Sequence, residues 1–136
     1  MAALTVTATS VVPNSTAIID SGILGETATA GQAVYLKAAD ARLWLAQCDG
    51  TAAEATAVGI LLSGGAAGQA ARFATSGSIN IGATTAKTAT YFAHGTAGGV
   101  GPQTDVASTN YITRLGYATA TDGTFIVDIK VTGVVV

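Results

Sequence analysis

The stretch TFIVDIKVT, residues 124–132, decides the fold class of this chain. Every second residue in it is apolar, namely Phe125, Val127, Ile129 and Val131. The residues between them are mostly polar, with Ile126 as the one apolar exception. Alternation with a period of two is typical of an antiparallel strand that has one face buried and one face in water. We therefore expect these four side chains to face a core.

The residues before this stretch predict its partner strand. Residues 110–120 are rich in strand-forming types, and Thr121, Asp122 and Gly123 follow them. Glycine takes a positive φ without steric cost, so this triplet has the chemistry of a hairpin turn. A second hairpin is expected from residues 33–38 and 42–48, joined by residues 39–41.

Further short strands are expected along the chain, at residues 57–62, 70–74, 78–81 and 89–92. Glycines such as Gly77 and Gly82 mark the breaks between them. The alanine-rich residues 51–56 favour a helical turn, but no window carries a sustained helical apolar face. Eight or so short strands at roughly ten-residue spacing predict an all-β fold, a small antiparallel β-barrel or sandwich.

The first 22 residues differ from the rest and allow two interpretations. Residues 5–12 are prone to form a strand, and Pro13 and Asn14 interrupt them. These residues form either the first strand of the barrel or an extended N-terminal arm (residues 1–22) that leaves the barrel domain (residues 23–136). About 20 extended residues reach roughly 65 Å, far enough to contact a neighbouring subunit. The arm residues expected to bind a partner are Leu4, Val6, Val11, Val12, Ile18 and Ile19.

The composition argues against several classes of function. Charged residues make up 10% of the 136 residues, against about 25% in an ordinary soluble domain. Six Lys and Arg residues are too few for a nucleic-acid footprint, so no nucleic acid is expected as a partner. No apolar run is long enough to span a bilayer, and the N-terminus has no secretory signal pattern. We expect neither a membrane partner nor secretion.

The sequence also does not group the histidine, cysteine and acidic residues as an active site would. Cys48 is the single cysteine and His94 the single histidine, and no carboxylate stands near His94 in sequence. Cys48 ends an apolar strand pattern and is expected to be buried. The acidic residues stand mostly beside turns, where Asp commonly caps the backbone. We expect no catalytic residue, no metal site, no cofactor and no enzymatic activity; the low charge instead predicts a surface covered by other protein.

Four segments together resemble a known family. They are GETATAGQAVYL (residues 25–36), AVGILL (57–62), AAGQAARFATSGSINIG (66–82) and YITRLGYA (111–118). In this combination the sequence resembles the head decoration, or cement, proteins of tailed bacteriophages. The resemblance covers about residues 25–118.

The resemblance implies a compact β-barrel, called a β-tulip in this class, that binds the outer surface of the phage head. It implies the major capsid protein as partner, self-association as a homotrimer or dimer, and synthesis in the host cytoplasm. The alternative is a component of the phage tail, baseplate or head fibre with a glycan-binding barrel. In that case Tyr35, Trp44 and Tyr117 are the candidates for stacking against sugar rings.

Overall fold

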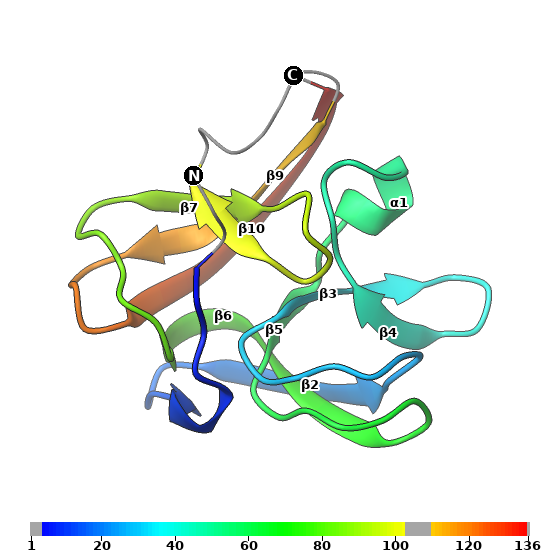
Figure 1. Ribbon diagram of the computed structural model, residues 1–136, viewed down its shortest axis with the longest axis horizontal. Coiled ribbons are helices and arrows are strands. Elements are labelled where there is room, and N and C mark those ends of the chain that lie inside the picture. The colour runs from blue at the N-terminus through cyan, green and yellow to red at the C-terminus, as the bar shows by residue number, and fades with distance from the viewer. Residues whose placement is uncertain (1–3, 103–109, 136) are drawn as a thin grey trace.

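The computed structural model describes residues 4–102 and 110–135 (Figure 1). Within them one sheet holds ten strands: β1 (Val11–Pro13), β2 (Ile18–Ile23), β3 (Ala33–Lys37), β4 (Arg42–Leu45), β5 (Gly59–Leu61), β6 (Ala70–Ile81), β7 (Thr90–Ala93), β8 (Val100–Pro102), β9 (Tyr111–Ala118) and β10 (Thr124–Val135). The helical content described is one 3-10 turn, η1 (Ala8–Ser10), and one helical turn, α1 (Ala52–Ala55). The prediction of an all-β antiparallel fold is confirmed.

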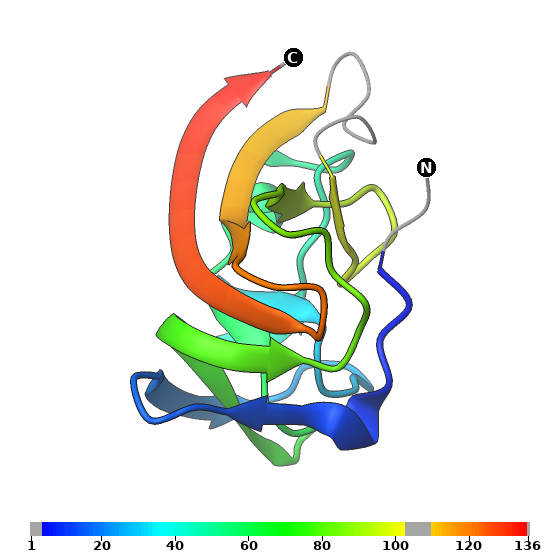
Figure 2. The ribbon, with the colours of Figure 1, turned by 90° about the vertical axis from the view of Figure 1, so that its left-hand side faces the viewer.

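The sheet curls on itself as a small barrel, in the order β4-β3-β5-β6-β10-β9-β7-β8. Its named strands pair antiparallel throughout, and β1 and β2 join it through β6 alone. Figure 2 shows β1 and β2 beside β6 at one end of the molecule, and β10 curving from β6 towards the opposite end. Both predicted hairpins are confirmed, as β3–β4 and β9–β10.

Strand β6 is the centre of this arrangement because four strands pair with it. One edge of β6 pairs with β2 and then with β1, which follow each other along it. The other edge pairs with β5 near Ala74 and with β10 from Ser76 to Asn80. Strands from the start, middle and end of the chain therefore meet on one 12-residue strand.

Two hydrophobic clusters lie on opposite faces of β3, β5 and β6. The larger cluster takes alternate residues of these strands, including Ala33, Ile60 and Ala74. The smaller cluster takes the chain neighbours of those residues, Val34, Leu61 and Phe73. Because successive side chains of a strand point to opposite faces, both faces of this part of the sheet are buried. The side chains buried in these clusters are uncharged, which accounts for part of the low charge.

The larger cluster is built around Phe125, whose side chain is fully buried. Its ring packs against the ring of Tyr91, with the two centroids 5.9 Å apart. Val127 is also buried, as predicted, and Ile129 is half-buried. The prediction is wrong for Val131, which is 45% exposed. The pairing of β10 with β9 shifts register between Val127 and Lys130, and the regular alternation ends there.

The structure also corrects the expected strand boundaries. Residues 70–74 and 78–81 belong to one strand, β6, rather than to two. Gly77 does not break the strand: it takes a φ of +89° and still pairs with Val127 of β10. Strand β8, in the glycine-rich part of the chain, was not expected.

In this single chain, residues 4–23 lie along the sheet as its edge. Leu4 N–H donates a 2.8 Å hydrogen bond to the carbonyl of Val100, and Thr7 N–H donates a 2.7 Å bond to that of Gly82. Beyond them β1 and β2 pair with β6, so the domain boundary proposed at residue 22 falls inside β2. In the single chain, β1 and β2 are thus strands of the sheet.

Replacing Phe125 by Ala tests the position of the core. We expect F125A to lower the free energy of unfolding by about 3–5 kcal/mol, because it leaves a cavity under Tyr91. The control V131A removes an exposed side chain and should change the free energy by less than about 0.5 kcal/mol. Urea unfolding measures both, and a loss below about 1 kcal/mol in F125A would contradict this core.

Replacing Gly77 by Ala tests how closely the N-terminal residues approach β6. A Cβ at Gly77 would lie 2.1 Å from the carbonyl oxygen of Thr16, whereas a Cβ at Gly68 would meet open space. Both glycines have nearly the same positive φ, so G68A measures the backbone strain alone, about 1–2 kcal/mol. We expect G77A to cost at least about 1 kcal/mol more in thermal unfolding. Equal losses would mean that residues 14–17 do not pack on β6.

Candidate functional site

Ionisable side chains of the described residues are dispersed and mainly support the backbone. Asp122 accepts hydrogen bonds from the hydroxyl (2.7 Å) and the backbone N–H (3.1 Å) of Thr124, which lower the pKa of its carboxyl. Asp40 accepts from the Arg42 N–H at 3.0 Å. Glu26 accepts from the backbone N–H of Leu45 at 3.1 Å. These carboxylates cap turns and strand ends, as predicted.

A cross-strand ion pair joins Arg114 of β9 to Asp128 of β10. Both side chains are partly exposed, so the pair lies at the surface of the sheet. Among residues 4–102 and 110–135, no group of three or more His, Cys, Asp or Glu side chains could hold a metal ion.

Cys48 and His94 are neighbours through their backbones. The Cys48 N–H donates a 3.1 Å hydrogen bond to the carbonyl of His94. The imidazole of His94 accepts a hydrogen bond through Nδ1 from the Thr96 N–H at 3.0 Å. Cys48 itself is fully buried in the larger cluster, and this burial, together with the Asp49 carboxylate, raises the pKa of its thiol. A protonated thiol without access to solvent is a core side chain rather than a nucleophile.

The three aromatic residues considered for sugar stacking do not form a platform. Tyr35 is 8% exposed and belongs to the larger cluster. The indole of Trp44 is covered by the Lys37 ammonium, 4.5 Å from the ring centroid, and by Gly25, where even a Cβ would collide with the ring. Tyr117 is exposed on β9, where its ring contacts Arg114.

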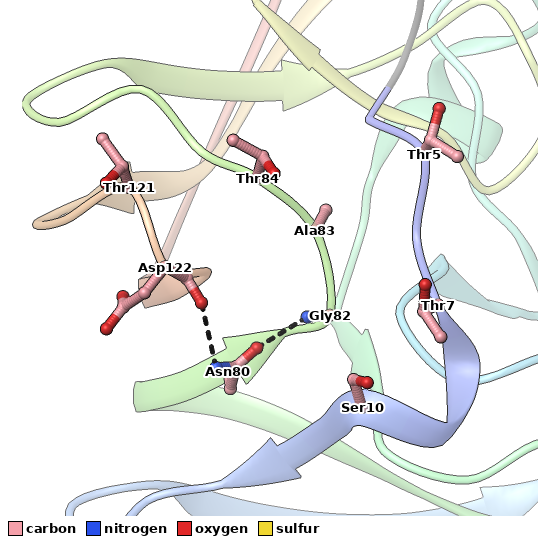
Figure 3. A pocket seen from close by; sticks show the side chains of 9 residues that line it. All are labelled: Thr5, Thr7, Ser10, Asn80, Gly82, Ala83, Thr84, Thr121 and Asp122. Atoms are coloured by element: carbon pink, nitrogen blue, oxygen red, sulfur yellow. Dashed lines mark hydrogen bonds between the residues drawn. The ribbon is translucent and has the colours of Figure 1, made fainter.

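A polar hollow of about 410 Å³ lies between the N-terminal segment, the end of β6 and the turn before β10 (Figure 3). Asn80 lines the hollow and bonds to two other segments that border it. Its side-chain amide donates to the carbonyl of Asp122 (3.2 Å), and its side-chain carbonyl accepts from the Gly82 N–H (2.8 Å). The hollow is lined mainly by small side chains that carry hydroxyl groups, and the hydrogen bonds of Asn80 there join segments of the fold.

The most distinctive surface feature is a set of exposed apolar side chains on β1 and β2. Val12, Ile18, Ile19 and Ile23 are 49%, 61%, 39% and 41% exposed. We call these four residues the β1–β2 surface. Exposed apolar surface on the edge strands of a sheet is a candidate for contact with another protein. This set is the candidate functional site.

The structure divides the six residues predicted for partner binding. Val12, Ile18 and Ile19 are exposed and belong to the β1–β2 surface. Val11 is buried, and Leu4 and Val6 are half-buried, with Leu4 packed against the larger cluster. Val11 faces inward because its register partner on β6 is the buried Ile81.

Two exposed apolar residues were missed by the sequence reasoning. Ile23 lies just past the boundary drawn at residue 22, although it continues the β2 pattern. Leu36 of β3 is 54% exposed. It borders an apolar hollow of about 230 Å³ between β2 and β3, with Leu43, Val58 and Phe73 below.

In sequence comparisons, no family model matches the chain and no curated protein matches it. Within the described residues, none of the helices has the length and apolar character needed to cross a membrane.

The buried thiol of Cys48 gives a pH-dependent prediction. Its pKa is raised in the folded chain, so above the ordinary thiol pKa of about 8.5 the unfolded chain loses the proton first. The stabilisation is complete below that pH and is lost as pH rises towards the folded pKa. We expect the free energy of unfolding, measured by urea under reducing conditions, to fall between pH 7 and 9.5. The fall should be smaller in C48A; identical slopes would contradict the assignment.

Proposed function

We propose that this chain is a non-enzymatic structural protein of a tailed-phage virion. It decorates the outer surface of the head and stabilises the shell by binding across subunits of the major capsid protein. The family resemblance of residues 25–118 suggests this class. The β1–β2 surface is the observation that carries the proposal, because it supplies a contact region for such a partner.

The chemistry of the β1–β2 surface suits a protein partner. Complete burial of a Val or Ile side chain contributes about 1.5–3 kcal/mol, and these four side chains are already partly buried. Docking them therefore contributes a few kcal/mol per copy. Weak contacts of this size become strong when several linked copies bind a repeating lattice, because the second contact forms at high effective concentration.

The position of the β1–β2 surface adds main-chain hydrogen bonding to this contact. In the ordered strands that the structure describes, β1 and β2 form an edge of the sheet beside β6. An edge strand offers backbone N–H and C=O groups to a strand of another protein, a common mode of recognition. Small neighbours such as Ser21 and Gly22 allow a second backbone to approach closely.

The distribution of charge supports a structural role over an enzymatic one. Catalysis usually depends on ionisable groups gathered in a cleft, where their pKa values are strongly shifted. Here the described carboxylates cap turns or pair across strands, and the buried thiol is protonated. The covered indole of Trp44 likewise gives little support to a glycan-binding tail or fibre protein.

Binding to capsid shells tests the proposal. Shells are assembled from the major capsid protein encoded in the same genome, incubated with the purified chain and sedimented. We expect the wild-type chain to sediment with the shells and the double variant I18D/I19D to lose at least about tenfold in affinity. This corresponds to about 1.4 kcal/mol and arises because two carboxylates would be buried at the contact.

The variant V131D is the control. Val131 lies on β10 and is 45% exposed, which is between the exposed fractions of Ile18 (61%) and Ile19 (39%). V131D should bind shells like the wild type. Equal losses in both variants would contradict the role of the β1–β2 surface. A wild-type chain that stays in the supernatant, or a source genome without a major capsid gene, would overturn the proposal as a whole.

A further inference from the structure

We propose that the apolar hollow between β2 and β3 binds an extended segment of a partner protein. The segment carries one large apolar side chain, which fills the hollow, and a lysine or arginine two residues away, which pairs with the Asp20 carboxylate. The site lies on the other face of β2 from the β1–β2 surface, because Ile19 and Ile23 alternate with Asp20 and Gly22 along the strand. It is therefore independent of the role proposed for that surface.

The hollow has the size and the lining for one side chain. It has a volume of about 230 Å³, and its apolar walls are Leu36, Leu43, Val58 and Phe73. An apolar cavity of about 150 Å³ holds a benzene molecule, whereas pockets for drug-sized ligands begin at about 300 Å³. The hollow is thus suited to a single leucine or aromatic side chain.

The floor of the hollow is already packed in the single chain, and its rim is open. Leu43 and Phe73 are buried members of the smaller cluster, whereas Leu36 at the rim is exposed. The absence of a side chain at Gly22 keeps space above the floor, because a Cβ there would lie 3.0 Å from the Leu43 side chain. An incoming side chain therefore covers Leu36 without repacking the core.

The charge of the hollow comes from Asp20, the one charged residue among those that line it. Asp20 is exposed, and its carboxylate accepts a 2.8 Å hydrogen bond from the Ser21 N–H. A carboxylate that accepts one such bond has further acceptor sites for a cation. The nearby Lys37 cannot fill them, because it follows Leu36 on β3 and its ammonium lies over the Trp44 ring on the other face. A partner's lysine or arginine complements this charge.

The backbone of β2 favours an extended partner. Among the described strands β2 pairs with β6 alone, so its other edge is open to a further strand. The Leu24 N–H donates a 2.9 Å hydrogen bond to the Gln69 carbonyl of the β6 side, and by antiparallel alternation Ser21 directs its carbonyl away from β6. Residues two apart in an added strand share a face, so its apolar side chain and its cation reach the hollow and Asp20 together.

Titration of the nitrogen-15-labelled chain with a blocked pentapeptide, followed by NMR, tests the inference. The peptide has leucine at its centre, serine on either side and lysine at both ends, so that either strand direction presents the same pattern. We expect saturable shifts of the Gly22, Leu36 and Val58 amides, which line the hollow, and none at Val131 of β10. Alanine in place of the leucine should lower the affinity at least about tenfold, because no large side chain then fills the hollow.

The variant L36A tests the apolar wall. It should weaken the binding of the leucine peptide at least about threefold, because part of the contact with the incoming side chain is lost. The matched control V131A also truncates an exposed apolar side chain, but on β10, and should bind the peptide like the wild type.

The variant D20N tests the charge while keeping an oxygen for the Ser21 N–H. The control D40N makes the same change at Asp40, which accepts from the Arg42 N–H. In the wild type and in D40N, glutamate in place of both lysines of the peptide should weaken binding about threefold or more, and less at high salt. In D20N this difference should disappear.

Three results would overturn the inference. They are the absence of saturable shifts at the hollow, equal affinities for the leucine and alanine peptides, and a preference for lysine that persists in D20N. Shifts of the hollow amides on dilution of the chain without peptide would show that a second copy occupies the hollow, and would also overturn it. None of these results bears on the binding of I18D/I19D to shells, so the two proposals fail separately.

Discussion

The fold depends on one constraint, namely that β6 is paired along both edges and covered on both faces. Four strands bond to its edges, and the two hydrophobic clusters lie on either side of the sheet that it shares with β3 and β5. The buried side chains of β6 are apolar, and several of them are small. Ala71 and Ala74 are two of these, on opposite faces of the strand. The alanine-rich composition is thus a property of the core as well as of the surface.

The buried clusters give a second reason for the small number of charged residues. From composition alone, the scarcity of charged residues indicated a surface hidden by other proteins. The structure adds an internal cause, because the residues buried in the two clusters are apolar. The large apolar side chains that stay exposed include the four of the β1–β2 surface, and Leu36 on β3.

The sequence predicted the parts of the fold that depend on local chemistry. The two hairpins were recognisable because their turn residues and alternating strands stand next to each other, as in Asp122 and Gly123 before Phe125. The continuity of β6 through Gly77 could not be recognised from the sequence. A glycine within a strand pattern looks like a break until its partner on β10 is known. Half of the proposed partner-binding residues are exposed. Val11 and Val12 look alike in the sequence, but Val11 is buried and Val12 is exposed. Val11 is buried because it pairs with Ile81, which lies 70 positions later in the chain.

The central place of β6 also governs how the chain reaches its native state. Its partners β1 and β10 come from opposite ends of the sequence, so the decisive pairings are non-local, and non-local sheets form slowly. During synthesis, β6 leaves the ribosome well before β10 is made. Until then the edge that β10 will cover has only β5 beside it. Until β10 is made, the edge of β6 from Ser76 to Asn80 is unpaired, and unpaired strand edges make a folding chain prone to aggregate.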